Sequence, residues 1–303
     1  MSSSHAYRGR FAPSPTGPLH FGSLLAALGS WLLAKHAQGQ WWVRVEDLDP
    51  LREVPGAAVQ HLQTLAAFGL VADAPVAWQS SRGALYQAAV DQLLANGTAF
   101  QCHCSRSDLA NSGGIHRRCT PSKRRADPAI RLHVPTNTQV SFVDALQGAI
   151  VQNVARQVGD FILKRADGCW AYQLAVVVDD AAQGMTDIVR GADLLDSTPR
   201  QILLQRALEL PTPRYLHLPL VMDAQDYKLS KSTAALPVDA ANPMPALHAV
   251  WQALGQPAFA LHGHHNATGL LRAAVAAFDP ALLPQRPSIP IAALHNEAGI
   301  NAV

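Results

Sequence analysis

The 303-residue chain has no apolar stretch long enough to cross a lipid bilayer, and its amino terminus lacks a basic region followed by an apolar segment. We therefore expect a soluble protein of the cytoplasm, neither secreted nor membrane-spanning. Net charge is also small, at +2 with a pI near 8.4, so a nucleic-acid partner would have to use local basic patches. The chain has no internal repeat and no long low-complexity segment, while its 49% apolar content suffices for a full core.

Cysteine is scarce, but three of the four cysteines lie within eighteen residues. In a reducing cytoplasm such clustering indicates a metal site before a disulfide. Three thiolates and one imidazole are enough for a closed tetrahedral site, and the Gly113-Gly114 turn can bring its two halves together. We therefore predict a structural zinc ion. Its expected ligands are Cys102, Cys104, His116 and Cys119.

Two alternatives to this ligand set stay open from the sequence. His103 competes with His116 as the fourth ligand, and the thiols can also be buried without a metal. Cys169 lies apart and is interpreted as an ordinary strand residue. A basic run surrounds the cysteines, and it is either a solvated face or a set of contacts to RNA phosphates. The run consists of Arg117, Arg118, Lys123, Arg124 and Arg125.

A phosphate-binding turn is predicted near the amino terminus. Residues 8–11 form a short strand, a loop rich in proline and glycine follows, and a helix begins near Gly22. Gly17 and Gly22 let the backbone approach a ligand, and the helix start presents amide donors and a positive dipole end to anionic oxygen. His20 adds a donor. Taken alone, this stretch is more typical of an ordinary strand-to-helix turn with one exposed histidine.

A second basic element follows the apolar run of residues 215–222. Residues 228–232 read Lys-Leu-Ser-Lys-Ser and are predicted to form a mobile loop that leaves a strand. Such a loop can fold over a triphosphate, where Lys228 and Lys231 offset the charge that develops as pyrophosphate leaves. A lone pair of lysines at this spacing is usually a solvated loop. The two elements together, in this order, are far more specific.

The two elements resemble a known family. Residues 20–23 (His-Phe-Gly-Ser) resemble the His-Ile-Gly-His element of class I aminoacyl-tRNA synthetases, and residues 228–232 resemble their Lys-Met-Ser-Lys-Ser element. The stretches at 11–17, 44–49 and 189–195 resemble the glutamyl branch rather than the glutaminyl one. The match covers about the first 235 residues. Because only 71 residues follow Ser232, the chain resembles a truncated paralogue group of that branch, whose members put glutamate on the queuosine base of the tRNA(Asp) anticodon.

The fold expected from the residues is α/β. Strands alternate with helices, including predicted helices from Asp49-Pro50 to Gly69, over 83–95 and from Ser197-Thr198-Pro199 onward. This alternation argues for a parallel sheet with a ligand crevice at its carboxyl edge. The resemblance implies a Rossmann-like nucleotide-binding domain in two halves with an inserted subdomain, which in the family holds the acceptor end of tRNA. The expected parts are the catalytic halves 8–97 and 186–235, the insertion 98–185 with the zinc site, and a short helical C-terminal appendage, 236–303.

The resemblance also implies a pocket for L-glutamate. Arg10 and Arg190 are expected to bind its carboxylates, Glu46 to face its ammonium group, and Tyr172 to add a hydroxyl. A charged fork rejects glutamine, because a neutral amide would leave the fork unpaired. The complete set expected to bind glutamate is Arg10, Phe11, Ala12, Pro13, Ser14, Glu46, Tyr172 and Arg190.

The reaction implied by the resemblance begins with ATP and Mg²⁺. The glutamate α-carboxylate attacks the α-phosphorus to form glutamyl-adenylate, without tRNA, while His20, Lys228 and Lys231 stabilise negative charge. ATP is expected to contact His20, Gly22, Ser23 and Lys231. Glutamate then passes to a hydroxyl of the cyclopentene diol of queuosine. Ser23 stands where the longer family motif has its second histidine. The protein is expected to act as a monomer.

Three other functions stay open from the sequence. A minimal glutamyl-tRNA synthetase would charge tRNA(Glu), although we expect the residues that follow the lysine loop to be too few for a full anticodon-reading domain. A small-molecule nucleotidylyltransferase also uses a His-x-Gly-His turn on a parallel sheet. A non-catalytic binder of amino acid or RNA is disfavoured by the presence of His20 and both lysines.

Overall fold

The computed structural model describes residues 6–223 and 238–290, so the predicted catalytic residues Lys228 and Lys231 lie outside the described residues. The first half of the chain folds as alternating strands and helices, and its strands form a parallel sheet in the order β1-β2-β3. These elements are β1 (Arg8–Phe11), α1 (Phe21–His36), β2 (Gln40–Val45), α2 (Ala57–Ala67) and β3 (Ala77–Trp78). The α/β class is therefore confirmed.

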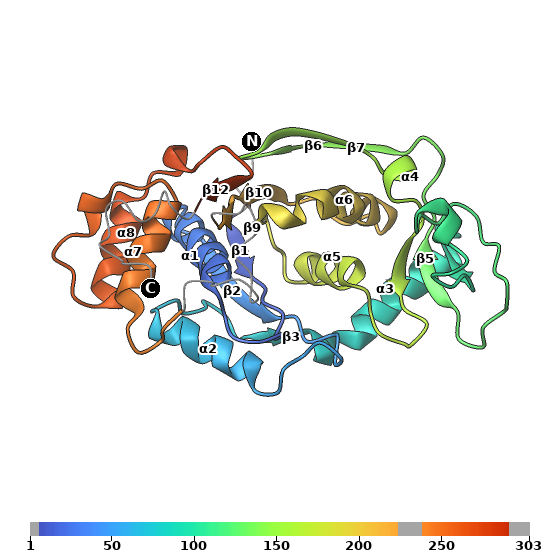
Figure 1. Cartoon of the computed structure of the whole chain (residues 1–303), viewed down its shortest axis with the longest axis horizontal. Helices are drawn as coiled ribbons and strands as arrows, with labels where there is room; N and C mark the ends of the chain where they lie inside the picture. Colours follow the sequence, from blue (N-terminus) through green and yellow to red (C-terminus); the bar gives the residue numbers. More distant parts are fainter. Residues whose placement is uncertain (1–5, 224–237, 291–303) are drawn as a thin grey trace.

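A second parallel pair lies beside the first sheet. Strand β9 pairs with β10 in parallel, and β9 lies next to β1 (Figure 1). Thr186, just before β9, joins the two halves: its hydroxyl accepts from the Arg8 backbone N at 2.8 Å, and its own N–H donates to the Arg8 carbonyl at 2.9 Å. The elements of this half are β9 (Asp187–Gly191), η3 (Ala192–Ser197), α6 (Thr198–Ala207), β10 (Arg214–Leu218) and β11 (Leu220–Met222).

Between these halves the chain builds an antiparallel sheet, β4-β5-β8, and a two-stranded ribbon, β6-β7. The ribbon runs from α4 back toward β10 along one edge of the molecule (Figure 1). The elements from 79 to 182 are η1 (Gln79–Arg82), α3 (Gly83–Ala95), β4 (Ala99–Cys102), η2 (Ala110–Ser112), β5 (Ala129–Leu132), β6 (Gln139–Asp144), β7 (Gly148–Asn153), α4 (Val154–Gln157), β8 (Phe161–Lys164) and α5 (Tyr172–Ala182).

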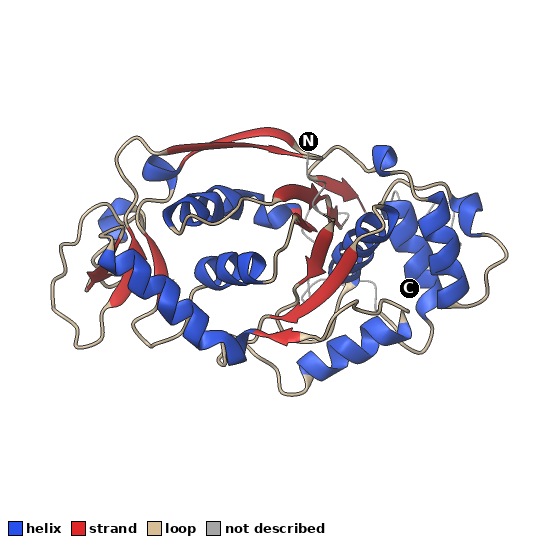
Figure 2. Cartoon of the chain, turned by 180° about the vertical axis from the view of Figure 1, so that it is seen from behind, coloured by secondary structure: helices blue, strands red, loops and turns tan. Residues whose placement is uncertain are grey.

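The C-terminal part packs at the opposite end from the antiparallel sheet (Figure 2). Helices α7 and α8 contact α1, as expected of a helical appendage, but β12 also adds a strand to β11 in parallel. The appendage is therefore not purely helical. Its described elements are α7 (Pro243–Ala253), η4 (Ala258–Leu261), α8 (Ala267–Ala277), η5 (Pro280–Leu282) and β12 (Ser288–Pro290). In the described ranges, no helix combines the length and apolar character that crossing a membrane requires.

The buried apolar residues form two main clusters. One surrounds α1 and includes Trp41, Phe68 and Trp251, so the appendage shares a core with the first half of the sheet. The other joins α3, α5 and α6 to the inserted sheet and includes Tyr86 and Leu163. The crevice lies between these two cores. The domain boundaries given above stay a prediction, because α3 and α5 share the second core from either side of the inserted strands.

Local signals predicted most helix positions. The helix over 83–95 is confirmed, and α6 begins at Thr198-Pro199 as its N-terminal proline indicates. The predicted start of the second helix was wrong, since α2 begins at Ala57 rather than at Asp49. The Asp49 carboxylate does not cap a helix there; its Oδ2 accepts from Arg52 Nε at 2.8 Å and from Arg165 Nη1 at 3.3 Å.

Candidate active site

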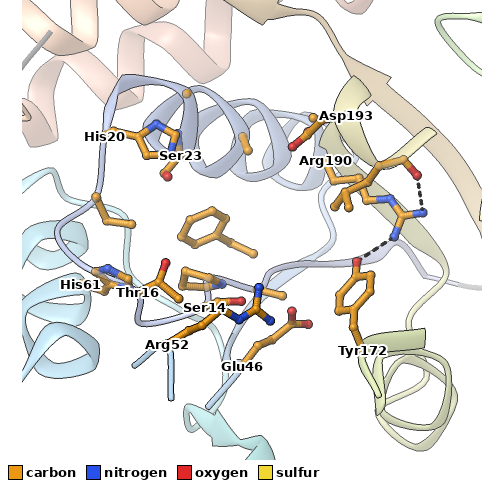
Figure 3. Close-up of a pocket in the computed structure, with 18 of the residues that line it drawn as sticks. Ser14, Thr16, His20, Ser23, Glu46, Arg52, His61, Tyr172, Arg190 and Asp193 are labelled. Atoms are coloured by element: carbon orange, nitrogen blue, oxygen red, sulfur yellow. Dashed lines mark hydrogen bonds between the residues drawn. The ribbon is translucent and has the colours of Figure 1, made fainter. Parts of the chain in front are cut away.

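A cavity of about 790 Å³ opens where β1, β2 and β9 end. It contains every described residue that the sequence predicted for glutamate or ATP (Figure 3). These residues are Arg10, Phe11, Ala12, Pro13, Ser14, His20, Gly22, Ser23, Glu46, Tyr172 and Arg190. They come from both halves of the sheet and from α5, so one cavity is built from segments far apart in the sequence.

One wall of the cavity is the amino-terminal end of α1. His20 caps this helix, with its Nδ1 accepting from the Ser23 backbone N at 3.3 Å. A Cβ at position 22 would lie 3.1 Å from the His20 ring, so glycine there leaves room for the capping imidazole. The first turn of α1 holds no acidic residue. The helix therefore directs backbone donors and a positive dipole end at the cavity, as an anionic ligand requires.

The loop before α1 is held by a residue that the sequence reasoning missed. Gly17 adopts a φ of 129°, which favours glycine, and its carbonyl oxygen lies 2.6 Å from His61 Nε2. Only a donor can face a carbonyl, so Nε2 carries the ring proton. His61 is a buried residue of α2. No short motif marks it, because its partner lies 44 residues away.

The floor of the cavity is a buried network of guanidinium and carboxylate groups. Arg10 binds Asp180 in a bidentate manner, at 3.0 Å and 3.2 Å. Arg44 Nη1 donates to the same Asp180 at 2.8 Å, and Arg44 Nη2 donates to Glu46 at 3.2 Å. Arg44 is fully buried. Two of the groups that the sequence assigned to a substrate, Arg10 and Glu46, are thus joined through two residues that it did not single out, Arg44 and Asp180.

This network extends to α3 through Asp179, which is fully buried. One Asp179 oxygen accepts from Gln79 Nε2 at 2.7 Å and from the Tyr86 hydroxyl at 2.8 Å. The other pairs with Arg82 at 2.5 Å. Adjacent carboxylates on α5 therefore point in two directions. Asp180 binds the sheet, whereas Asp179 binds η1 and α3.

Arg44 pairs with three carboxylates, Glu46, Asp180 and, at 3.7 Å, Asp179. Glu46 and Asp180 respond differently to these surroundings. Burial raises the pKa of Glu46 and outweighs the opposing charges of Arg44 and Arg10. Burial also acts to raise the pKa of Asp180, but the combined charges and hydrogen bonds of Arg10 and Arg44 hold it below its usual value. Asp180 is therefore the firmly ionised partner. Glu46 is the carboxylate that ionises less readily, because burial raises its pKa.

Arg190 lies at the far end of the cavity from His20 (Figure 3). Its Nη1 donates to the Tyr172 hydroxyl at 3.3 Å, its Nη2 to Thr198 Oγ1 at 2.8 Å, and its Nε to His217 Nε2 at 3.0 Å. These partners are all uncharged. Unlike the guanidinium groups of Arg10 and Arg44, the one of Arg190 is not neutralised by a contacting carboxylate among the residues that the structure describes.

A second candidate site lies in the insertion, where the four predicted metal ligands gather. Cys102 Sγ lies 3.3 Å from His116 Nε2 and 4.0 Å from Cys119 Sγ, and Cys104 Sγ lies 3.9 Å from Cys119 Sγ. Tetrahedral bonds of about 2.3 Å to sulfur place two sulfur atoms about 3.8 Å apart. The donor set and its spacing therefore fit a zinc ion. His103, the competing ligand, instead accepts from the Arg125 backbone N at 3.1 Å.

Two residues missed by the sequence reasoning hold these ligands in place. Asp160 Oδ2 lies 2.8 Å from His116 Nδ1, which leaves Nε2 pointing at the cysteines. Arg131 donates to Cys102 Sγ at 3.3 Å and to the Asp160 carbonyl at 2.9 Å. Gly159, at a φ of 68°, passes so close to the His116 carbonyl that any Cβ would clash.

The basic run around this cluster of metal ligands is exposed. Arg117 donates to the Arg156 carbonyl at 2.7 Å, and no ion pair to a carboxylate is formed by the run within the described ranges. Its charge is therefore available to a partner. The exposed residues are Arg117, Arg118, Lys123, Arg124 and Arg125.

A ligand cavity at the carboxyl edge of parallel strands, closed by a helix start, is typical of nucleotide-binding α/β proteins. Residues 6–128 and 115–242 match the family described as tRNA synthetases class I (E and Q), catalytic domain. The fold is similar to the crystal structure of a glutamate tRNA ligase from Elizabethkingia meningosepticum, with a TM-score of 0.80 and 25% identity over 95% of this chain and 68% of that one.

Relatives of known name are more similar still. The chain is 62% identical to the glutamyl-Q tRNA(Asp) synthetase of Xanthomonas campestris pv. campestris, over 95% of this chain and 96% of the relative. It is 53% identical to the glutamyl-Q tRNA(Asp) synthetase of Burkholderia mallei, over 92% and 98% respectively. The chain belongs to the class I tRNA synthetase family for E and Q, and within it to the glutamyl-Q tRNA(Asp) synthetases.

The network under the cavity makes a testable prediction about stability. Replacing Asp180 by Asn leaves Arg10 and Arg44 with an uncharged partner in a buried site. We expect the free energy of unfolding to fall by about 3–5 kcal/mol, measured by urea denaturation. The matched control is Asp91→Asn, at an exposed position of α3, which we expect to change it by less than about 0.5 kcal/mol. Equal effects of the two variants would contradict the role given to Asp180.

Proposed function

We propose that the protein activates L-glutamate with ATP and then transfers the glutamate to the queuosine base in the anticodon of tRNA(Asp). The observation that carries the proposal is the layout of the cavity. A positively charged Arg190 lies at one end, the start of α1 lies at the other, and Glu46 lies between them (Figure 3). The names of the relatives described above supply the identity of the acceptor.

The layout supports one orientation of glutamate. Its α-carboxylate must meet ATP, so it faces His20 and the start of α1, where phosphate is favoured. Its side-chain carboxylate then extends toward Arg190 and Tyr172. Its ammonium group lies near Glu46, which is 9% exposed and whose ionised form a nearby cation favours. The fork of Arg10 is engaged by Asp180, so we assign Arg10 a supporting part in this pocket.

The first step asks for alignment and charge stabilisation. The α-carboxylate oxygen attacks the α-phosphorus, pyrophosphate leaves, and the backbone donors of α1 with His20 stabilise the phosphate oxygens. We propose that Lys228 and Lys231 offset the charge of the leaving pyrophosphate. Mg²⁺ bound to ATP would neutralise part of the same charge. The residues Gly22 and Ser23 would contact the nucleotide from the helix start.

The second step needs a large polyanion at the mouth of the cavity. We propose that the exposed basic run on the insertion contacts tRNA phosphates, which fix the orientation of the RNA without reading its sequence. A hydroxyl of the queuosine diol then attacks the glutamyl carbonyl and AMP leaves. The four predicted metal ligands would serve this step indirectly, since a zinc ion bound to them would stabilise the loop that carries the basic run.

The function is tested by supplying the protein with ATP, labelled glutamate and tRNA from cells that make queuosine and from cells that do not. We expect label on an anticodon fragment of tRNA(Asp) after ribonuclease digestion, and only with queuosine-containing tRNA. Label on the terminal adenosine of tRNA(Glu) would instead make the protein a minimal glutamyl-tRNA synthetase. Absence of glutamate-dependent exchange between ATP and pyrophosphate would exclude both functions.

The raised pKa of Glu46 predicts how binding depends on pH. Only the ionised carboxylate attracts an ammonium group, and burial raises the pKa of Glu46, so its charge is lost at a higher pH than for an ordinary carboxyl group. We expect the KM for glutamate in pyrophosphate exchange to rise as the pH is lowered through this raised pKa. Glu46→Gln should show a high KM with no such pH dependence. A variant with the pH profile of the wild type would contradict this role.

Metal analysis tests the predicted zinc site separately. We expect about one zinc ion per chain in the purified protein, since three thiolates and an imidazole form a closed structural site. Cys119→Ser should lose most of the zinc, whereas Cys169→Ser, outside the cluster, should keep it. Zinc contents that are equal in these two variants would show that Cys119 is not a ligand.

A further inference from the structure

Behind Arg190 lies a chain of buried side chains that does not line the cavity. Arg190 Nε donates to His217 Nε2 at 3.0 Å, and His217 Nδ1 lies 2.6 Å from Asp144 Oδ2. The exposed fractions are 5% for Arg190, 0% for His217 and 1% for Asp144. Arg190 belongs to β9 and His217 to β10, whereas Asp144 ends β6 of the inserted ribbon. The ribbon thus reaches the amino-acid end of the cavity through two hydrogen bonds.

The partners fix the proton on the histidine ring. A guanidinium group can only donate, so His217 Nε2 must be unprotonated to accept from Arg190. The proton of the neutral ring is then on Nδ1 and is donated to Asp144. Burial and the charge of Arg190 lower the pKa of His217, against the hydrogen bond that His217 donates to Asp144, so the ring stays neutral. A single arrangement of protons is therefore compatible with this geometry.

Asp144 is itself held firmly. Its Oδ1 accepts from the backbone N–H groups of Leu146, Gln147 and His217, at 3.0, 2.9 and 3.2 Å. Burial acts to raise the pKa of Asp144, but its hydrogen bonds to His217 and to these amides lower it further than burial raises it. Asp144 is thus an ionised acceptor with both oxygens occupied. It cannot turn toward another partner without breaking several bonds.

The consequence for Arg190 follows from its donors. A guanidinium group has five N–H donors in a rigid plane. His217 takes the Nε donor, Thr198 and the Leu194 carbonyl lie by Nη2, and Tyr172 takes one donor of Nη1. Within residues 6–223 and 238–290, one Nη1 donor is left for a ligand in the cavity, together with a charge that no contacting carboxylate neutralises. Because His217 accepts from Nε, the Nε edge of the guanidinium group is bound within the protein and Nη1 faces the cavity.

We propose that Asp144 and His217 are positioning residues that orient Arg190 toward the side-chain carboxylate of the substrate, and that they thereby set its preference for a carboxylate over an amide. This inference rests on the proposed function. The two residues act through Arg190, since neither lines the cavity. Neutral acceptors fix the plane of the guanidinium group without neutralising its charge. A substrate carboxylate can then pair with that charge, whereas a neutral amide cannot.

The test compares two substitutions of one residue. His217→Gln places an amide oxygen near the position of Nε2, so an acceptor for Arg190 is kept. His217→Asn reaches only the position of Nδ1, so a donor to Asp144 is kept and the acceptor is lost. In pyrophosphate exchange we expect His217→Asn to raise the KM for glutamate about tenfold or more and His217→Gln to raise it by about threefold or less. The KM for ATP should stay unchanged in both.

Asp144→Asn tests the other end of the chain. The new amide donates to Nδ1, which moves the ring proton to Nε2 and sets it against the Arg190 N–H. We expect the ratio of exchange with glutamate to exchange with glutamine to fall about tenfold or more. The control is Asp127→Asn, at an exposed position, which should leave the ratio unchanged. Equal KM values in the two His217 variants, or an unchanged ratio in Asp144→Asn, would overturn the inference.

A measurement on the unsubstituted protein keeps the inference testable if a variant fails to fold. Nitrogen NMR of histidine-labelled protein, with the His217 signals assigned, should show that the His217 ring is neutral, is protonated at Nδ1 and does not titrate near neutral pH. A His217 ring protonated at Nε2 would overturn the inference, whether or not the protein uses glutamate. Failure of the unsubstituted protein to exchange pyrophosphate with glutamate would instead overturn the proposed function, so the two failures are distinguishable.

Discussion

The sharing of one buried carboxylate by two arginines is the interaction on which the rest of the structure depends. Asp180 receives Arg10 from β1 and Arg44 from β2, and its ionised form is held by both charges. Burying any one of these three ions alone would cost several kcal/mol, so each is stable only because the others are present. The floor of the cavity therefore depends on strands β1 and β2 and on helix α5 together.

Helix α5 accordingly does more than connect the insertion to the second half of the sheet. Tyr172 begins it, and Asp179 and Asp180 lie about two turns later, so the helix presents its hydroxyl near Arg190 and its carboxylates under the sheet. The same helix packs against α3 and α6 in the second core. One helix thus contacts Arg190 at one end of the cavity and Arg10 and Arg44 under its floor.

Three arginines of the site show how the surroundings of a guanidinium group determine its role. Arg10 and Arg44 are paired with carboxylates, so their charge is used within the protein. Among the described residues, Arg190 is surrounded by an imidazole, two hydroxyls and a carbonyl, with no contacting carboxylate. The first two arginines hold structural elements together, and we propose that the third recognises an anion. Residue type alone does not separate these tasks, because all three side chains are almost fully buried.

The sequence by itself determined the features that depend on neighbours within a few residues. The strand over 8–11, the helix over 83–95 and the helix start at Thr198-Pro199 follow from periodicity and turn residues, and the spacing of cysteines and of the His20 turn is equally local. The tertiary structure decided the rest. Asp180 meets Arg10 from 170 residues away, and His217 meets Asp144 from 73 residues away. Such pairs leave no periodic signal in the sequence. A buried charge needs a partner because burial removes its water, and that partner is set by the fold rather than by spacing along the chain.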